Sequence, residues 1–120
     1  MHVTRLADAP AYEAPNHVDM RCLRLQGKEA GPSTQMWMGM SQILPGGHTA
    51  LDPSPMEKLY LVLEGELHVT AQSSAGQREE QVLGPWDSVR FAPGESRQLR
   101  NRSARPAVVA LVMPNQAPAT

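Results

Sequence analysis

The stretch LPGGHTALDPSPMEKLYLVLEGEL, residues 44–67, contains the strongest strand signal of the chain. Its second half begins an apolar run, KLYLVLEGELHVT at 58–70, in which Gly65 marks a bend or a bulge. The pattern predicts two strands that meet at Gly65. Because side chains alternate along a strand, Lys58 and Tyr60 are expected on the same face.

Shorter runs of the same kind continue outward in both directions. They cover residues 20–26, 35–44, 79–83, 88–92, 97–101 and 107–113, with turn-forming residues at 45–47, 52–55, 73–77, 92–95 and 102–106. Many short strands at this spacing predict an all-β sandwich or closed barrel. We expect a single domain over residues 1–120, with an N-terminal arm at 1–16 and a C-terminal tail at 114–120.

Composition excludes several classes of partner. Hydrophobic residues make up 41% of the chain and the net charge is −1, so no basic field is present to hold nucleic acid. The single cysteine, Cys22, allows no internal disulfide and fits a reducing compartment. The longest apolar run, 107–113, is too short to span a bilayer. These features predict a cytoplasmic protein with neither nucleic acid nor a membrane as its partner.

The opening stretch resembles the first motif of the cupin family, which is Gly, five residues, His-x-His, three or four residues, Glu, six residues and Gly. With Gly46 and Gly65 on the two glycines, Asp52 and Ser54 fall on the two histidines and Lys58 falls on the glutamate. The resemblance implies a cupin-type double-stranded β-helix, or jelly-roll, barrel.

A downstream segment, WDSVRFAPGESRQLRN at 86–101, resembles the second cupin motif, Pro-x-Gly, two residues, His, three residues and Asn. Ala92, Gly94 and Asn101 occupy the proline, glycine and asparagine positions, and Arg97 replaces the histidine. The spacing matches throughout, whereas only the structural residues match in kind.

In metal-binding cupins, three histidines and a glutamate converge on a divalent ion. Here the matching positions hold Asp52, Ser54, Lys58 and Arg97. An ammonium and a guanidinium group have no lone pair to offer, and their charge repels a cation. We therefore expect neither a metal nor another cofactor at the usual place. A displaced metal site built from His48, Glu57 and Asp52 stays open as an alternative.

By the cupin resemblance, Lys58 and Arg97 lie in the barrel interior, where two cations are costly unless an anion meets them. That anion is either Asp52 or Glu57, in a structural ion-pair network, or the carboxylate or phosphate of a ligand. In a third interpretation Lys58, with a lowered pKa, acts as a general base.

Strand alternation also predicts the walls of the site. Met36, Met38 and Met40 share one strand face, with Trp37 and Gly39 opposite, and we expect the methionines to form an apolar wall. For the core, we expect Leu61, Leu63, Val89 and Phe91 to be mostly buried, and Glu66 and Arg102 to be exposed.

The predicted function is the binding of a small anionic, carboxylated metabolite. Two classes stay open: a metal-independent isomerase, dehydratase or lyase that works by proton transfer, and a non-catalytic binding or sensing module. A metal-dependent dioxygenase or decarboxylase with displaced ligands is a third. The candidate catalytic groups are Lys58 and Asp52, and the candidate ligand-binding residues are Arg97, Ser54, Tyr60, Glu57 and Met38. The resemblance also implies a homodimer.

Overall fold

The computed structural model describes residues 1–119, which fold almost entirely into β-strands. The strands are β1 (Ala11–Tyr12), β2 (His17–Gln26), β3 (Met36–Thr49), β4 (Asp52–Pro53), β5 (Lys58–Glu64), β6 (Leu67–Gln72), β7 (Arg78–Leu83), β8 (Ser88–Phe91), β9 (Ser96–Arg100) and β10 (Ala107–Pro114). Two short 3₁₀ turns, η1 (Leu6–Asp8) and η2 (Lys28–Ala30), complete this part of the chain. No helix among residues 1–119 has the length and apolar character needed to cross a membrane.

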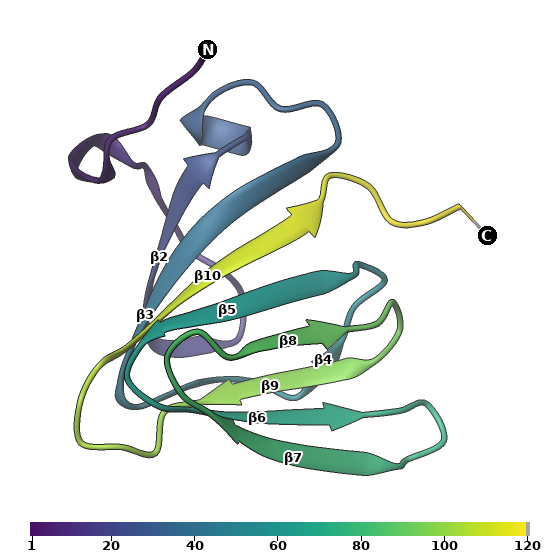
Figure 1. Cartoon of the computed structure of the whole chain (residues 1–120). Helices are drawn as coiled ribbons and strands as arrows, with labels where there is room; N and C mark the ends of the chain where they lie inside the picture. Colours follow the sequence, from purple (N-terminus) through teal and green to yellow (C-terminus); the bar gives the residue numbers. More distant parts are fainter. Residues whose placement is uncertain (120) are drawn as a thin grey trace.

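The strands pair antiparallel in a single sheet of order β7–β6–β9–β3–β10–β5–β8, while β2 pairs with β3, β1 with β2, and β4 with β9. The sheet curls on itself into a nearly closed barrel, with β2, β3, β10 and β5 in its upper half and β8, β9, β6 and β7 in its lower half (Figure 1). The predicted all-β barrel is confirmed. The predicted interruptions at Gly65 and at residues 92–95 are also confirmed, since each separates two strands.

Strand β3 is longer than the sequence predicted, because it continues through the Pro-Gly-Gly segment where a turn was expected. Up to Ile43 it pairs with β10 on one side and β2 on the other. Beyond the glycines it still pairs with β2, and His48 also pairs with Arg100 of β9. Gly46 adopts a φ of 82°, a conformation that favours glycine. This bend lets one strand belong to both halves of the barrel.

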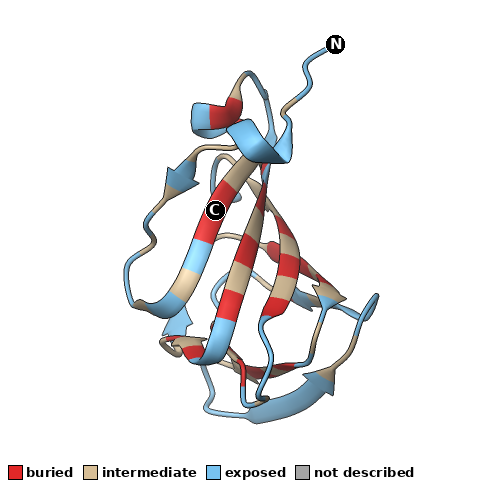
Figure 2. Cartoon of the chain, turned by 90° about the vertical axis from the view of Figure 1, so that its left-hand side faces the viewer, coloured by how far each residue is buried: buried red, intermediate tan, exposed pale blue. Residues whose placement is uncertain are grey.

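The core lies between the two halves, and buried residues alternate with more exposed ones along the strands (Figure 2). On β5, Lys58, Tyr60 and Val62 share a face, as alternation predicted, and this face is internal, as the cupin resemblance implied: all three are at most 7% exposed. The expectation that Leu61 and Leu63 are mostly buried was wrong. Both are only half-buried, because an inward-facing Lys58 sends the odd-numbered residues of β5 to the outer face.

In the second motif, one of the two residues expected in the core is buried and the other is not. Phe91 is 1% exposed, as expected, whereas Val89 is only half-buried. Asn101, at the end of this motif, is fully buried, and its side-chain amide donates hydrogen bonds to the carbonyl oxygens of Ile43 (2.9 Å) and Arg105 (2.7 Å). The motif asparagine therefore ties β9 to β3 and to the turn before β10.

The N-terminal arm packs on the barrel. The backbone N–H of Arg24 donates to the carbonyl of Pro10 (2.8 Å), and that of Ala50 donates to the carbonyl of Asn16 (2.9 Å). Between these two attachments, residues 12–17 pass over one end of the barrel interior.

Candidate functional site

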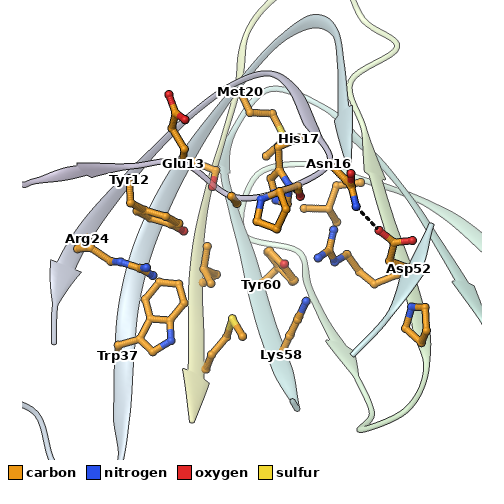
Figure 3. A pocket seen from close by; sticks show the side chains of 18 residues that line it. Tyr12, Glu13, Asn16, His17, Met20, Arg24, Trp37, Asp52, Lys58 and Tyr60 are labelled. Carbon is orange, nitrogen blue, oxygen red and sulfur yellow. Dashed lines mark hydrogen bonds between the residues drawn. The ribbon is translucent and has the colours of Figure 1, made fainter. Parts of the chain in front are cut away.

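A cavity of about 370 Å³ opens into the barrel beneath the N-terminal arm (Figure 3). Its lining is drawn from the arm, from five strands of the sheet, and from the short strand β4. The lining residues are Tyr12, Glu13, Ala14, Pro15, Asn16, His17, Met20, Arg24, Trp37, Ser41, Asp52, Pro53, Lys58, Tyr60, Arg97, Leu99, Leu111 and Met113. In Figure 3, Lys58 and Tyr60 point into the centre of the cavity, with Tyr12 and Trp37 on one side and Asp52 on the other.

Lys58 is the first residue of β5 and lies on the inward-facing side of the strand, together with Tyr60 and Val62. Its residue surface is 7% exposed. Burial lowers the pKa of its ammonium group from 10.5 to about 8; the positive charge of Arg97 acts in the same direction, and the Asp52 carboxylate opposes them. A substantial fraction of this amine is therefore neutral near physiological pH.

Arg97 enters the same cavity from β9 and is 8% exposed. It lies directly opposite Asp52 in the antiparallel pairing of β4 with β9. Within residues 1–119, however, no carboxylate forms an ion pair with Arg97, and its buried Nε has no hydrogen-bond partner. The Asp52 carboxylate instead accepts a hydrogen bond from the Asn16 side chain at 3.1 Å. The interior cation is therefore left with an unused donor.

The opposite end of the cavity is aromatic. The rings of Tyr12 and Trp37 meet edge to face, with centroids 5.8 Å apart and an angle of 89° between their planes. The Arg24 guanidinium lies 3.5 Å from the centre of the Tyr12 ring and 4.2 Å from that of Trp37, and its Nε is 3.0 Å from the Glu29 carboxylate. Unlike Arg97, Arg24 is already paired.

Three further groups around the cavity are held in their neutral forms. Burial raises the pKa of the Tyr12 and Tyr60 hydroxyls above the usual value. Burial also lowers the pKa of the His17 imidazole, and the nearby charges of Arg97 and Lys58 add to this effect. At neutral pH the cavity therefore presents hydroxyl groups and a neutral imidazole beside its two unpaired cations.

The structure brings together four of the seven candidate site residues. Asp52, Lys58, Tyr60 and Arg97 all line the cavity. Ser54 does not line it, and its hydroxyl oxygen accepts a hydrogen bond from the backbone N–H of Met56 (3.1 Å).

The other two candidates, Glu57 and Met38, lie elsewhere. Glu57 forms an ion pair with Arg90 on the surface, so it offers no charge to the interior. The methionine wall was expected on the wrong face of β3, because Trp37 points inward and Met38 outward, where Met38 is 41% exposed. Period-two alternation separates the two faces of a strand, but it does not tell which of them is internal.

Several lining residues were missed by the sequence reasoning. Tyr12 and Asn16 belong to the arm and His17 begins β2 directly after it; the sequence of this segment carries no strand pattern long enough to place it over the barrel. Trp37 is the missed residue that the sequence could have placed in the lining, because a large aromatic side chain that alternates with methionines is a good candidate for the inner face.

Comparison with known proteins identifies the family. Residues 39–113 match the cupin domain family, and the chain belongs to it. A relative from Mycobacterium tuberculosis (strain ATCC 25618 / H37Rv), named beta-D-galactosidase Rv1717, is 43% identical over 109 residues, which cover 91% of this chain and 90% of that protein.

Solved structures confirm the predicted cupin-type double-stranded β-helix. The polyketide cyclase RemF from Streptomyces resistomycificus matches with a TM-score of 0.80 and 20% identity, over 99% of this chain and 82% of that one. A cupin-2 domain protein from Rhodospirillum rubrum, Rru_A2000, matches with a TM-score of 0.77 and 16% identity, over 99% of this chain and 77% of that one. At these identities the likeness concerns the fold alone.

The residues present do not fit the metal that the family motif implies. Two of the four matching positions hold the interior cations Lys58 and Arg97, which offer no lone pair in their charged forms. The displaced set of His48, Glu57 and Asp52 is not brought together either: His48 borders a separate hollow with Arg100, and Glu57 is paired with Arg90. Within residues 1–119, no group of three or more His, Cys, Asp or Glu side chains is arranged to hold a metal ion.

Proposed function

We propose that this cavity binds a small organic anion whose carboxylate is held between Lys58 and Arg97. The observation that carries the proposal is the pair of interior cations that lack a carboxylate partner within hydrogen-bonding reach. Because a buried charge is costly without a counter-charge, a bound carboxylate would offset a penalty that the free protein bears. The guanidinium group of Arg97, which lines the cavity, supplies charged donors for it.

The remaining lining favours a ligand with an apolar or ring-shaped part. Trp37, Leu99, Leu111 and Met113 form an apolar wall, and the Tyr12 ring extends it. A polar end that fixes orientation and an apolar end that supplies contact area are the usual division in small-molecule sites.

The proposed chemistry is proton transfer by Lys58. A general base works best when its pKa is close to the working pH, and a pKa of about 8 meets that condition. Isomerisation, dehydration and lyase-type elimination of a carboxylated substrate all need such a base. If turnover is absent, the same cavity serves a binding or sensing module, and the carboxylate site is unchanged.

Calorimetric titration with a panel of small carboxylates and their uncharged amides tests the proposal. We expect at least one carboxylate to bind, its amide to bind at least about tenfold more weakly, and Arg97→Gln to remove the difference. Arg102→Gln, which changes an exposed arginine, is the matched control. Equal affinity for carboxylate and amide, or full affinity in Arg97→Gln, would contradict the proposal.

A second candidate function, hydrolysis of a β-galactoside, is favoured by the name of the Mycobacterium tuberculosis relative. Trp37 offers a ring on which a sugar could stack, and Asp52 and Glu13 are the two carboxylates of the lining. Glycosidases commonly use two carboxylates about 5–10 Å apart that both face the scissile bond. Figure 3 shows the Glu13 carboxylate directed away from Asp52, which favours the anion-binding proposal over this one.

Release of nitrophenolate from 4-nitrophenyl β-D-galactoside separates the two candidates. Hydrolysis that is lost in both Asp52→Asn and Glu13→Gln would support the galactosidase function. Absence of hydrolysis in the wild-type protein would remove it.

A further inference from the structure

The Lys58 side chain has the surroundings of a nucleophilic amine. Within residues 1–119 its ammonium group forms no ion pair and no hydrogen bond, although the residue is only 7% exposed. It points into the open cavity rather than into packed core (Figure 3). A lysine in this position is free to react with a bound molecule.

Charged and titratable groups surround this amine on several elements. Arg97 comes from β9, Asp52 from β4, His17 from β2 and Tyr60 from β5 itself. Burial and Arg97 together lower the Lys58 pKa to about 8. Desolvation and an adjacent cation are the two conditions that activate a lysine for attack on a carbonyl group.

Arg97 supplies the second requirement, which is a way to position the substrate. Arg97 lines the same cavity and its positive charge acts on Lys58, so its guanidinium group can hold a carboxylate beside the amine. A carbonyl carbon next to that carboxylate would then lie within reach of the Lys58 amine. A ligand that satisfies both residues at once is a keto acid.

We propose that Lys58 forms an imine with the carbonyl carbon of a keto acid whose carboxylate is bound by Arg97. The inference rests on the proposed carboxylate site and deepens it by naming the substrate class. The neutral amine attacks the carbonyl carbon, a C–N bond forms, and the carbonyl oxygen leaves as water. One amine proton and one proton from solvent leave with that oxygen, and the second amine proton stays on the nitrogen, so the product is a protonated imine. An adjacent C–H can then release its proton to solvent, and its electron pair moves toward the imine nitrogen.

The chain is well suited to a direct test, because it contains two lysines, Lys58 and Lys28. Lys28 is exposed and lies outside the cavity, so it serves as an internal control. The protein is incubated with pyruvate at about pH 8 and reduced with borohydride, which converts an imine into a stable amine. Intact mass and peptide mapping then locate a gain equal to one pyruvate less one oxygen atom.

We expect Lys58 to be labelled at least about tenfold faster than Lys28, since only Lys58 has a neighbour that holds the carboxylate. Lys28→Arg should label like the wild type. Lys58→Arg should lose the label while retaining the near-ultraviolet circular dichroism of a folded protein, and Arg97→Gln should slow labelling of Lys58.

Two results would overturn the imine proposal. One is labelling of Lys28 or of the terminal amine at the rate seen for Lys58. The other is an absence of label on Lys58 in the wild-type protein, a result that does not depend on any variant folding. Calorimetry on the same samples separates this failure from that of the proposed function: carboxylates that bind without any trapping at Lys58 leave the anion site standing and remove the imine.

Discussion

At the scale of single residues, Arg97 distinguishes a structural ion-pair network from a ligand site. Its register partner Asp52 is hydrogen-bonded to Asn16, and Glu57 is paired with Arg90 on the surface. Neither carboxylate therefore neutralises Arg97 by direct contact. A buried guanidinium without a partner destabilises the free protein, which is the expected signature of a site prepared for an anion.

Replacing Arg97 with methionine should leave the free energy of unfolding unchanged or raise it by up to roughly 2 kcal/mol, because an uncompensated interior charge is removed. Chemical denaturation at neutral pH measures the difference, with Arg102→Met as the control for loss of an exposed charge. A loss of about 3–5 kcal/mol would instead mean that Arg97 neutralises a buried carboxylate.

At the scale of elements, the glycine between β5 and β6 holds the barrel corner. Gly65 has a φ of 81°, and a Cβ atom there would lie 2.7 Å from the carbonyl oxygen of Pro106 and 3.0 Å from the Cα of Ala107. Gly76, in the turn between β6 and β7, has a similar φ of 86° but open space around it. Substitutions at these two glycines therefore distinguish the cost of backbone strain, present at both, from the cost of steric contact, present only at Gly65.

Gly65→Ala should lower the free energy of unfolding by about 2–4 kcal/mol, since the left-handed conformation and the contact with the segment before β10 both oppose a side chain. Gly76→Ala should cost only about 1 kcal/mol, for the conformation alone. Urea denaturation of both variants checks the difference. Equal losses would show that the close approach of Pro106 has no energetic effect.

The same elements show how far the sequence could predict the structure. The interruptions at Gly65 and at residues 92–95 were predictable, because their turn chemistry is local. The passage of β3 through Gly46 was not, since its pairing with β9 depends on residues more than fifty positions away. The sequence also did not predict which face of β3 points inward, because alternation alone does not distinguish the face of Trp37 from that of Met38.

At the scale of the whole molecule, motif spacing predicted that Lys58 and Arg97 would meet inside one barrel, although they lie on different strands. The spacing carried this information because it records the register of a known fold. The arm carried no comparable pattern. Tyr12 and His17 are held at the cavity by pairing with Cys22 and Thr49 and by the nearby attachments at Arg24 and Ala50, which no local signal predicts.

The buried lysine should also give stability a characteristic pH dependence. Its pKa is about 8 in the folded protein and 10.5 in its unperturbed state, so between these values the unfolded chain binds more protons than the native one. Stability contributed by Lys58 therefore rises with pH above about 8. Above pH 10 the trend should reverse, because the Tyr12 and Tyr60 pKa values are raised from 10.0 and only the unfolded tyrosines then ionise readily.

Denaturation between pH 8 and 10 should thus show an increase in the free energy of unfolding for the wild-type protein and a smaller increase for Lys58→Met. Lys28→Met is the matched control and should follow the wild type. A wild-type curve that is flat or falls across this range, or one that Lys58→Met reproduces, would contradict the assigned pKa.

The central claim, that an organic anion binds beside Lys58, is tested most directly by an NMR titration of the two lysine side chains with and without the carboxylate that binds most tightly. In the free protein the Lys58 signal should titrate near pH 8. In the complex its pKa should rise above about 8, because a neighbouring carboxylate stabilises the ammonium form, but stay below 10.5, because burial and Arg97 still act on it; the Lys28 signal should be unaffected. A Lys58 signal that titrates at the same pH in the free and saturated protein would contradict the claim.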